Sequence, residues 1–411
     1  MNFEYFIAKR IVSAREYKNS ISSPIIKIAI VSIAIGFITM LISIATGVGL
    51  QKKIHEKVSA FNGDIIISNF DTNFSNDSQN PISKTQDFYP KFTSIEGIKH
   101  IQATASKGGV IRTATDFEGI VIKGVGADYN WDNFSGFLVE GSLPNYTDKL
   151  HEDILISEYL TKRLHLKIGD KVTTFFFRED SSKPPRSRSF NISGIYNSGF
   201  LEFDEKFVIA DIRHIQRLNK WTADEIGSFE VFVEDFDQID AIGNQVYQET
   251  NSLLDSQTIN ERYYSIFKWL ELFDFNIILI IGIMILVAGI NMITALLVLI
   301  LERTQMIGIL KALGSSDKSV RSIFIYNAMY LVSVGLFWGN MIGIGLLVLQ
   351  KQFKLITLDP TIYYVTEAPV YLGISYILML NLGTFLLCFS MLLIPSYVIS
   401  KISPVRAIRF E

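Results

Sequence analysis

The stretch FNIILIIGIMILVAGINMITALLVLIL, residues 275–301, decides the fold of this 411-residue chain, because it holds no charged side chain. An α-helix rises about 1.5 Å per residue, so about 20 apolar residues cross a hydrocarbon layer roughly 30 Å thick. Three further stretches are uncharged and long enough for the same task, at residues 28–50, 322–350 and 368–400. The sequence therefore predicts four membrane-spanning helices.

Composition and charge exclude several classes of protein. Hydrophobic residues make up 49% of the chain and charged residues only 19%, whereas an average soluble protein has about 25% charged residues. A transmembrane β-barrel would show alternating segments of about ten residues instead of unbroken apolar blocks. Residues 51–270 hold 24 Lys and Arg against 32 Asp and Glu, a net charge of −8 that would repel a nucleic-acid backbone. We expect a membrane protein that does not bind nucleic acid.

The distribution of basic residues predicts which side of the membrane each segment faces, because Lys and Arg near span ends stay in the cytoplasm. Basic residues gather in three short segments: Lys9, Arg10, Arg15, Lys18 and Lys27 before the first span, Arg303, Lys311, Lys318 and Arg321 between the second and third, and Lys401, Arg406 and Arg409 after the fourth. Both termini are thus expected in the cytoplasm. The formal net charge of −3 conceals a basic inner face and an acidic outer one.

The expected fold class is a membrane protein with four transmembrane α-helices (1 + 3) and a large α+β extracytoplasmic domain between the first and second. The expected segments are an amphipathic cytoplasmic helix at 1–24, spans at 25–50, 271–301, 322–350 and 368–400, the α+β domain at 51–270, a cytoplasmic helix at 302–321, a short outer loop at 351–367 and a cytoplasmic tail at 401–411. An ordinary juxtamembrane extension is the alternative for the first segment.

A cleaved signal peptide is the alternative for the first span. The apolar run is longer than the core of a signal peptide, which has about 7–15 residues, and no Ala-x-Ala site follows it. We therefore expect a retained membrane anchor.

The outer region mixes strands and helices irregularly. Its β-rich runs lie at residues 64–68, 119–125, 171–177, 190–196 and 228–233. This mixture predicts an α+β domain and not a doubly wound parallel sheet. We expect residues 146–218 to form a subdomain inserted into a framework of residues 51–145 and 219–260. Residues 71–83, rich in Asn, Ser and Asp, are expected to form a loop.

A second loop is expected where the sequence reads EDSSKPPRSRS, at residues 179–189. Pro184 and Pro185 have no backbone N–H to donate, so this segment cannot form a central strand. We expect it to project from the domain as an exposed loop.

Three glycines in the third span, Gly335, Gly339 and Gly343, recur at four-residue spacing. Such spacing lets helix backbones approach closely within a membrane. The glycine face is expected to pack either against another helix of the same chain or against a second copy. No Asp, Glu, Lys, Arg or His lies in the uncharged stretches 275–301, 322–350 and 368–400 of the last three spans, which argues against an ion-coupled carrier or proton pump.

The sequence lacks the patterns of enzymes, metal sites and nucleotide-binding sites. The five histidines show no i, i+4 pair, and the lone cysteine, Cys388, lies within the fourth span. Neither a P-loop nor a G-x-S-x-G nucleophile motif occurs. We expect no catalytic residue, no metal and no cofactor bound by this chain. Any work driven by ATP would need a partner subunit.

The segment ERTQMIGILKALGSSD, residues 302–317, could receive such a partner. Met306, Leu310 (or Ile309) and Leu313 fall on one helical face, Gly314 can end the helix, and Ser315 can cap the next one. A short amphipathic helix of this kind suits docking into a groove on another protein. The alternative is a helix that lies on the inner leaflet of the membrane.

This segment and the Ile- and Phe-rich span that follows it resemble the FtsX-like permeases of ABC transporters, which have one span, a large outer domain and three further spans. In that family the loop forms the coupling helix that the ATPase grips. The resemblance implies that Ile307, Leu310 and Leu313 fill the ATPase groove. It also implies a list of coupling residues: Glu302, Arg303, Met306, Ile307, Gly308, Leu310, Lys311, Leu313 and Gly314. Gly308 and Gly314 would allow close approach, and Glu302, Arg303 and Lys311 would supply charge pairs at the rim.

Four further stretches are similar to the lipoprotein-releasing, LolC/LolE-type members of the family: FEYFIAKRIVSARE, DILISEYLTKRLHLKIGDKV, SFNISGIYNSGFLEFDEKFVIADI and ISPVRAIRFE. This resemblance implies a permease of the bacterial inner membrane with a periplasmic domain. It implies two permease copies, identical or paired with a paralogue, that work with two cytoplasmic ABC ATPase subunits, on which ATP and Mg bind. A lipoprotein would be lifted out of the membrane lipid and passed to a periplasmic carrier.

One permease of that subgroup holds the soluble carrier with a projecting loop that contains proline. The corresponding residues here are Pro184, Pro185, Arg186 and Arg188, and the alternative is a plain exposed loop.

Two rival functions stay open within the family. A macrolide-exporter-like permease would drive a periplasmic adaptor without passing cargo through its own spans. A cell-division-type protein would regulate a cell-wall hydrolase, although that subgroup usually has a shorter outer domain.

Overall fold

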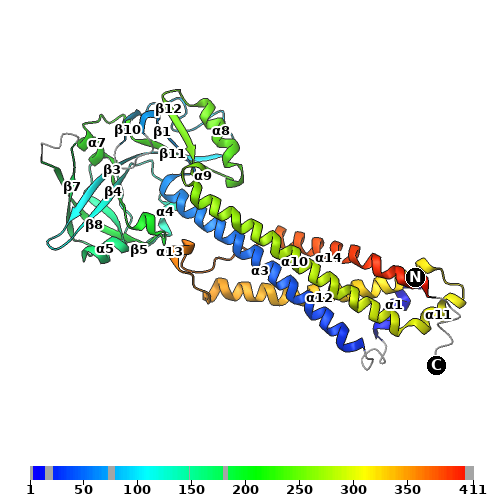
Figure 1. Ribbon diagram of the computed structural model, residues 1–411. Coiled ribbons are helices and arrows are strands. Elements are labelled where there is room, and N and C mark those ends of the chain that lie inside the picture. Colours follow the sequence, from blue (N-terminus) through cyan, green and yellow to red (C-terminus); the bar gives the residue numbers. More distant parts are fainter. Residues whose placement is uncertain (1–2, 14–21, 73–78, 148, 179–183, 403–411) are drawn as a thin grey trace. The chain divides into compact units, whose positions relative to one another are not determined.

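The structure of the chain is a computed structural model that describes residues 3–13, 22–72, 79–147, 149–178 and 184–402. Several residues used in the predictions lie outside these ranges: Arg15, Lys18, Arg406 and Arg409 of the basic segments, residues 73–78 and 179–183 of the two expected loops, and the end of the ISPVRAIRFE stretch. Figure 1 shows the chain as a ribbon with many of its helices and strands labelled.

The chain divides into two compact units. The first, which we call the helical unit, comprises Met1–Gln51, Trp269–Thr357 and Glu367–Glu411. The second, the sheet unit, comprises Lys52–Lys268 and Leu358–Thr366. The short loop 358–366 therefore belongs with the sheet unit, although it lies between the third and fourth spans in the sequence.

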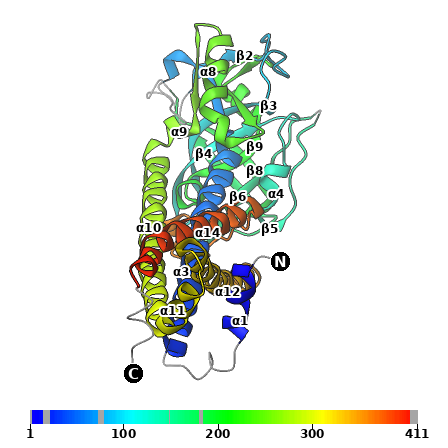
Figure 2. The same cartoon turned by 90° about the vertical axis from the view of Figure 1, so that its right-hand side faces the viewer.

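Among the residues that the structure describes, four helices are long and apolar enough to cross a membrane, and this confirms the predicted fold class. They are α3 (Ser22–Asn62), α10 (Tyr264–Glu302), α12 (Asp317–Phe353) and α14 (Ile374–Ser396), the last continued by the 3-10 helix η3 (Tyr397–Lys401). The described part of the helical unit also contains the shorter helices α1 (Phe3–Ser13) and α11 (Thr304–Ala312). Figure 2 shows α10, α11, α12 and α14 from a second side.

The glycine face of α12 packs against α3 of the same chain. A methyl group built on Gly335 would lie 2.8 Å from Ile33 Cγ2, and one built on Gly339 would lie 3.1 Å from Phe37 Cβ. Gly343 likewise faces Leu41, at 3.0 Å. These distances leave no room for a side chain, so the glycines allow the first and third spans to approach closely.

A reciprocal pair of amides joins α12 to α14. Asn340 Nδ2 donates to Asn381 Oδ1 at 2.7 Å, and Asn381 Nδ2 donates to Asn340 Oδ1 at 3.0 Å. Each amide also donates to the carbonyl four residues earlier in its own helix, Leu336 O or Ile377 O, at 2.8 Å. The pair therefore satisfies its donors inside an apolar bundle, where an unpaired amide would be costly.

The sheet unit is built on a ten-stranded mixed sheet in the order β12-β1-β11-β3-β4-β9-β6-β8-β5, with β7 paired to both β3 and β8. The strands are β1 (Ile65–Asn69), β3 (Ile98–Arg112), β4 (Phe117–Val125), β5 (Leu138–Gly141), β6 (Asp153–Ser157), β7 (Lys171–Phe176), β8 (Arg186–Tyr196), β9 (Phe207–Asp211), β11 (Ser228–Val233) and β12 (Leu254–Thr258). A separate two-stranded sheet pairs β2 (Ile82–Ser83) with β10 (Glu225–Ile226).

Strand β3 takes part in two different arrangements. Its first half, from Ile98 to Thr104, pairs with β11, whereas its last three residues pair with both β4 and β7. Because β7 also pairs with β8, the strands β3, β4, β9, β6, β8 and β7 close into a ring. The pairs β4–β9 and β6–β8 are parallel. Parallel neighbours need crossover connections, which accounts for the mixed α+β character of the unit.

Short helices and 3-10 turns complete the sheet unit: η1 (Phe70–Thr72), α4 (Asp132–Ser135), α5 (Glu158–Leu164), α6 (Leu201–Asp204), α7 (Ile212–Asn219), η2 (Phe236–Gln238), α8 (Ile239–Glu249), α9 (Ile259–Arg262) and α13 (Pro360–Tyr363). The inserted subdomain 146–218 stays a prediction.

The expected loop 179–189 is shorter than predicted. Residues Arg186 to Ser189 belong to β8 and pair with β7, with Phe176 opposite Arg186 and Thr173 opposite Ser189. The two prolines prevent pairing only where they stand themselves, and the residue after them has an N–H to donate. The described part of the connection therefore ends at Pro185.

We expect Gly339→Leu to separate α3 from α12 and to destabilise the purified protein by about 1–3 kcal/mol, the usual cost of overpacking a well-packed site. Thermal unfolding in detergent micelles, followed by intrinsic fluorescence, measures the change. Gly345→Leu is the matched control, because a methyl group built on Gly345 meets nothing within 4 Å. Equal unfolding temperatures for the two variants would contradict the packing described above.

Candidate functional site

The candidate site is α11, the short helix between the second and third spans. Arg303 interrupts α10 with φ −103° and ψ 19°, so α11 starts as a separate helix at Thr304. It ends before Gly314, whose φ of +92° is a left-handed conformation that glycine adopts without strain. The sequence placed the next cap at Ser315. In the structure Ser316 caps α12 and accepts a hydrogen bond from Ser319 N at 3.2 Å.

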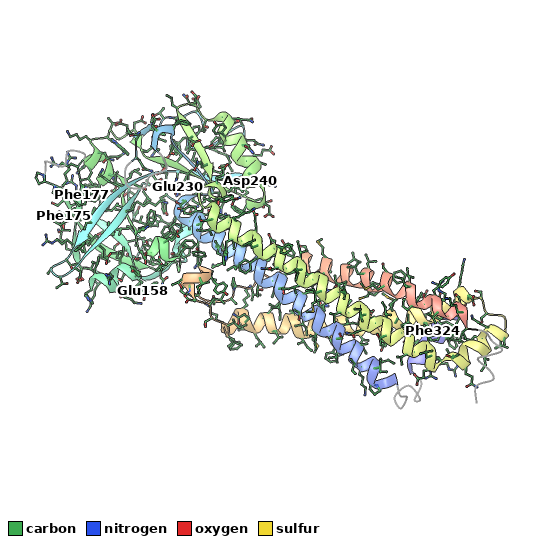
Figure 3. All side chains as sticks on the ribbon, in the orientation of Figure 1. Glu158, Phe175, Phe177, Glu230, Asp240 and Phe324 are labelled. Carbon is green, nitrogen blue, oxygen red and sulfur yellow. The ribbon has the colours of Figure 1, made fainter. Side chains whose placement is uncertain are left out.

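One face of α11 is buried in the helical unit. Ile307 is fully buried and packs in the same apolar core as Val320, Ile323 and Phe324. Phe324 is labelled in Figure 3. Gly308 is buried as well, and Met306 and Leu310 are half-buried against this core. The expectation that Ile307 fills a partner's groove therefore fails for this conformation, because its side chain points into the bundle.

The opposite face of α11 is exposed and partly apolar. Ile309 is 48% exposed and Leu313 is 79% exposed, and they stand one helical turn apart. Gln305 and Ala312 are also exposed. We call Gln305, Ile309, Ala312 and Leu313 the exposed α11 face. Glu302, the last residue of α10, is exposed, and Arg303, which stands between α10 and α11, is half-buried.

Lys311 lies inside the bundle instead of at the rim where it was expected. Its side chain is 8% exposed and pairs with Asp317 Oδ1 at 2.8 Å. Its ammonium group also donates to Ile399 O at 2.8 Å and to Ile402 O at 3.0 Å. Carbonyl groups at a helix end have no partner within the helix, so a cation there is favourable. Lys311 thus attaches α11 to the end of the fourth span.

Further polar contacts gather around α11. Arg321 donates to Ser396 Oγ at 3.1 Å, and its guanidinium lies 5.2 Å from the centre of the Tyr397 ring. Ser319 Oγ donates to Glu4 Oε1 at 2.7 Å, which joins α1 to α12. The start of the chain, α11, the start of α12 and η3 therefore meet at one end of the helical unit, as Figure 1 shows.

The second candidate site, at the β7–β8 connection, is described only in part. Pro184 and Pro185 are exposed, and Arg188 is half-buried. Arg186 donates from Nη1 to Leu218 O, so this side chain braces β8 against α7. Phe177, which directly follows β7 and is labelled in Figure 3, is 70% exposed.

Within the described ranges no group of three His, Cys, Asp or Glu side chains is placed to hold a metal ion.

The site found here consists of an exposed apolar helix face and its internal anchor. Sequence reasoning missed the anchor, because Lys311 and the Ile399 carbonyl are 88 residues apart. One feature of the sequence could have indicated it. Lys311 stands four residues after Ile307, so the two side chains lie on the same face of the helix.

Comparison with protein families gives two matches that together cover most of the chain. The family described as FtsX-like permease C-terminal matches residues 278–404. The family described as MacB-like periplasmic core domain matches residues 28–248. The first match contains α11, and the second contains most of the sheet unit.

Several curated proteins are similar in sequence. The lipoprotein-releasing system transmembrane protein LolC of Haemophilus influenzae is 26% identical over 63% of this chain and 64% of that protein, so the matched part spans less than two thirds of this relative. LolC of Neisseria meningitidis serogroup B is 25% identical over 100% of both chains. LolE of Haemophilus influenzae is 18% identical over 99% of both.

Solved structures resemble only part of the chain. The periplasmic region of MacB from Actinobacillus actinomycetemcomitans matches with a TM-score of 0.33 and 15% identity, over 49% of this chain and 91% of that one. The extracellular domain of the noncanonic ABC-type transporter YknZ matches with a TM-score of 0.31 and 16% identity, over 47% of this chain and 99% of that one.

We expect Lys311→Met to loosen α11 and to lower the free energy of unfolding by about 2 kcal/mol, because the variant leaves buried carbonyl oxygens without a donor. Thermal unfolding in micelles measures the loss, and limited proteolysis should cut near Gly314 faster than in the wild type. Lys318→Met is the control, since Lys318 is exposed. The same effect from both variants would show that Lys311 is no anchor.

Proposed function

The chain belongs to the FtsX-like family of ABC transporter permeases, and from this premise we propose that it is the membrane subunit of a transporter that releases lipoproteins from the bacterial inner membrane. The full-length similarity to LolC and LolE proteins supports the proposal. As members of a permease family, such chains are not themselves catalysts. ATP and Mg would bind to a separate cytoplasmic ATPase.

The observation that carries the proposal is the exposed α11 face. Ile309 and Leu313 expose apolar surface on a helix whose other side is anchored by Ile307 and Lys311. An apolar helix face of this kind fits a groove on a partner protein. The ATPase would therefore contact Ile309 and Leu313, with Gln305 and Glu302 at the edge of the contact.

The anchor explains how such docking could move the spans. Lys311 joins α11 to η3 and to the start of α12, and α12 is joined to α14 by the Asn340–Asn381 pair. A push on α11 would therefore shift the third and fourth spans together. The glycine face would pass this shift to α3, against which it packs.

The remaining partners follow from the same premise. A second permease, identical or a paralogue, would complete the transporter, and a lipid-anchored protein would be its cargo. The apolar, uncharged spans suit acyl chains better than ions. The connection near Pro184, Pro185, Arg186 and Arg188 is the proposed contact for a periplasmic carrier. On this view the large domain is periplasmic, and both termini lie in the cytoplasm.

A second candidate function is adaptor-driven export. The match to a MacB-like periplasmic core domain over residues 28–248 favours it. In this case the sheet unit would act on a periplasmic adaptor protein, and no lipoprotein would enter the spans.

For the docking surface, we expect Leu313→Asp to reduce copurification of the ATPase by at least about tenfold, because it places a charge in the centre of an apolar contact. The measurement is the amount of ATPase retained on the tagged permease. Leu355→Asp is the matched control, since Leu355 is also an exposed leucine (70%) but follows the other end of α12. Undiminished ATPase recovery with Leu313→Asp would exclude this face as the docking site.

For the activity, we expect depletion of the permease to leave lipid-anchored proteins in the inner-membrane fraction. The measurement is membrane fractionation after depletion in a host without a second permease of this kind, with re-expression of the chain as the control. Normal delivery of lipoproteins in the depleted cells would contradict the proposal. Normal delivery combined with a loss of small-molecule export would favour the adaptor-driven function.

A further inference from the structure

The loop between the third and fourth spans has its own ordered structure within the sheet unit. Leu358 N donates to Thr366 O at 3.0 Å and closes the loop. Asp359 caps α13 by accepting from Thr361 N at 2.9 Å, and Pro360 occupies the first helical position. Val365 is 2% exposed. The loop is therefore a folded part of the sheet unit rather than a simple connector.

Tyr364 is the residue that holds this loop in place. Its φ of +58° is left-handed, which is uncommon for a residue with a side chain. Its carbonyl oxygen accepts a hydrogen bond from Lys57 Nζ at 3.0 Å, and Lys57 is 6% exposed. An unfavourable backbone conformation persists only where the surroundings fix it, and such positions concentrate at functional elements.

The Tyr364 ring begins a stack of four aromatic rings. Tyr364 stacks on Phe200, Phe200 stacks on Phe203, and Phe203 stacks on Phe61, each with 4.7 Å between ring centres. The interplanar angles are 16°, 23° and 19°. Phe200, Phe203 and Phe61 are buried. Aromatic pairs at this separation attract one another beyond their buried area. We call these four residues the aromatic stack.

A tight turn before α6 positions the middle of the stack. Gly199 has a φ of +63°, and a methyl group built on it would lie 2.8 Å from Lys57 Nζ. The Asp204 carboxylate accepts from Ser198 Oγ at 2.7 Å and from Gly199 N at 3.1 Å. Burial raises the pKa of Asp204, and these donors oppose the rise. The turn thus fixes Phe200, which follows Gly199.

The other end of the aromatic stack is attached to the sheet. Phe61 stands in the last turn of α3, and its carbonyl oxygen accepts from Lys123 Nζ at 2.5 Å. Lys123 also pairs with Glu230 at 2.6 Å, and the two side chains are 2% and 7% exposed. Figure 3 labels Glu230 in β11. A buried pair in this geometry resists displacement, because separating it leaves an uncompensated charge.

We infer that Tyr364, Phe200 and Phe203 are positioning residues that couple the last two spans to the sheet unit during the ATP-driven cycle, a step that rests on the proposed function. The loop is joined covalently to α12 on one side and, through residues 367–373, to α14 on the other. A shift of these spans pulls on Tyr364, and the aromatic stack carries that pull to α6 and to the end of α3. The stack acts on the transport step without touching ATP or cargo.

The test compares Tyr364→Leu, which keeps apolar bulk but removes the ring, with Tyr364→Phe, which keeps the ring. Both are assembled with the ATPase in nanodiscs, and lipoprotein released per ATP hydrolysed is measured. We expect Tyr364→Leu to bind and hydrolyse ATP normally but to release at least about fivefold less lipoprotein, the lower end of typical coupling between two sites. We expect Tyr364→Phe to release as much lipoprotein per ATP as the wild type does. Ile362→Ala is the control, because Ile362 is 59% exposed in the same loop.

A readout without cargo separates this inference from the proposed function. Hydrogen exchange across residues 197–207 is compared with and without trapped nucleotide. We expect the nucleotide to change exchange there in the wild type and in Tyr364→Phe, but not in Tyr364→Leu. A wild type that releases no lipoprotein yet shows this pattern would refute the proposed function alone. The same nucleotide response in Tyr364→Leu as in the wild type, or a loss of response in Tyr364→Phe, would overturn the inference.

Discussion

Hydrocarbon offers no hydrogen-bond partner to the polypeptide backbone, and the arrangement of this chain follows from that constraint. Within the described residues, four segments satisfy their own backbone groups as long helices. Some of the polar side chains within them find partners on neighbouring helices. Asn340 and Asn381 bond reciprocally, and Asn291 donates to Ser32 Oγ at 2.5 Å between α10 and α3. Apolar contact alone gives helices little reason to associate in lipid, so these bonds and the glycine face determine which helices pair.

At one end of the helical unit, the same demand for partners produces a helix with two different faces. The carbonyl groups around η3 need donors, and Lys311 supplies them from α11. Ile307 is buried as a consequence, because it lies on the same side of the helix. Ile309 and Leu313 remain exposed. They form an apolar surface on a helix whose opposite face is attached to the bundle by Lys311 and Ile307. If the proposed ATPase docks on this surface, the anchor would let α11 pass the resulting force to the spans, whereas a helix without such an anchor would shift by itself.

The sheet unit has a rigid frame, and the loop between the last two spans is attached to that frame. The closed ring of strands and the buried Lys123–Glu230 pair fix the frame. The aromatic stack connects the loop between the last two spans to this frame through Tyr364. The chain therefore enters the sheet unit at three places, through α3, through α10 and through the loop 358–366. The proposed function would need such connections, because ATP would be hydrolysed on one side of the membrane and cargo released on the other.

The sequence by itself determined the four spans, their 1 + 3 order and the mixed α+β domain, because burial in lipid and strand patterning are local properties of a segment. Family membership also followed from local stretches such as residues 302–316. The sequence also predicted a helix at residues 302–314, where α11 lies, but it assigned Ile307 and Lys311 to a partner-facing surface, whereas both face inwards. It also extended the exposed loop into β8. Tertiary structure alone decided those points, together with the pairing of Gly339 with Phe37 and of Tyr364 with Phe200. The physical reason is that contacts decide whether one side of a helix is buried and which ring an aromatic side chain stacks on. Those contacts are made by residues that lie far away in the sequence.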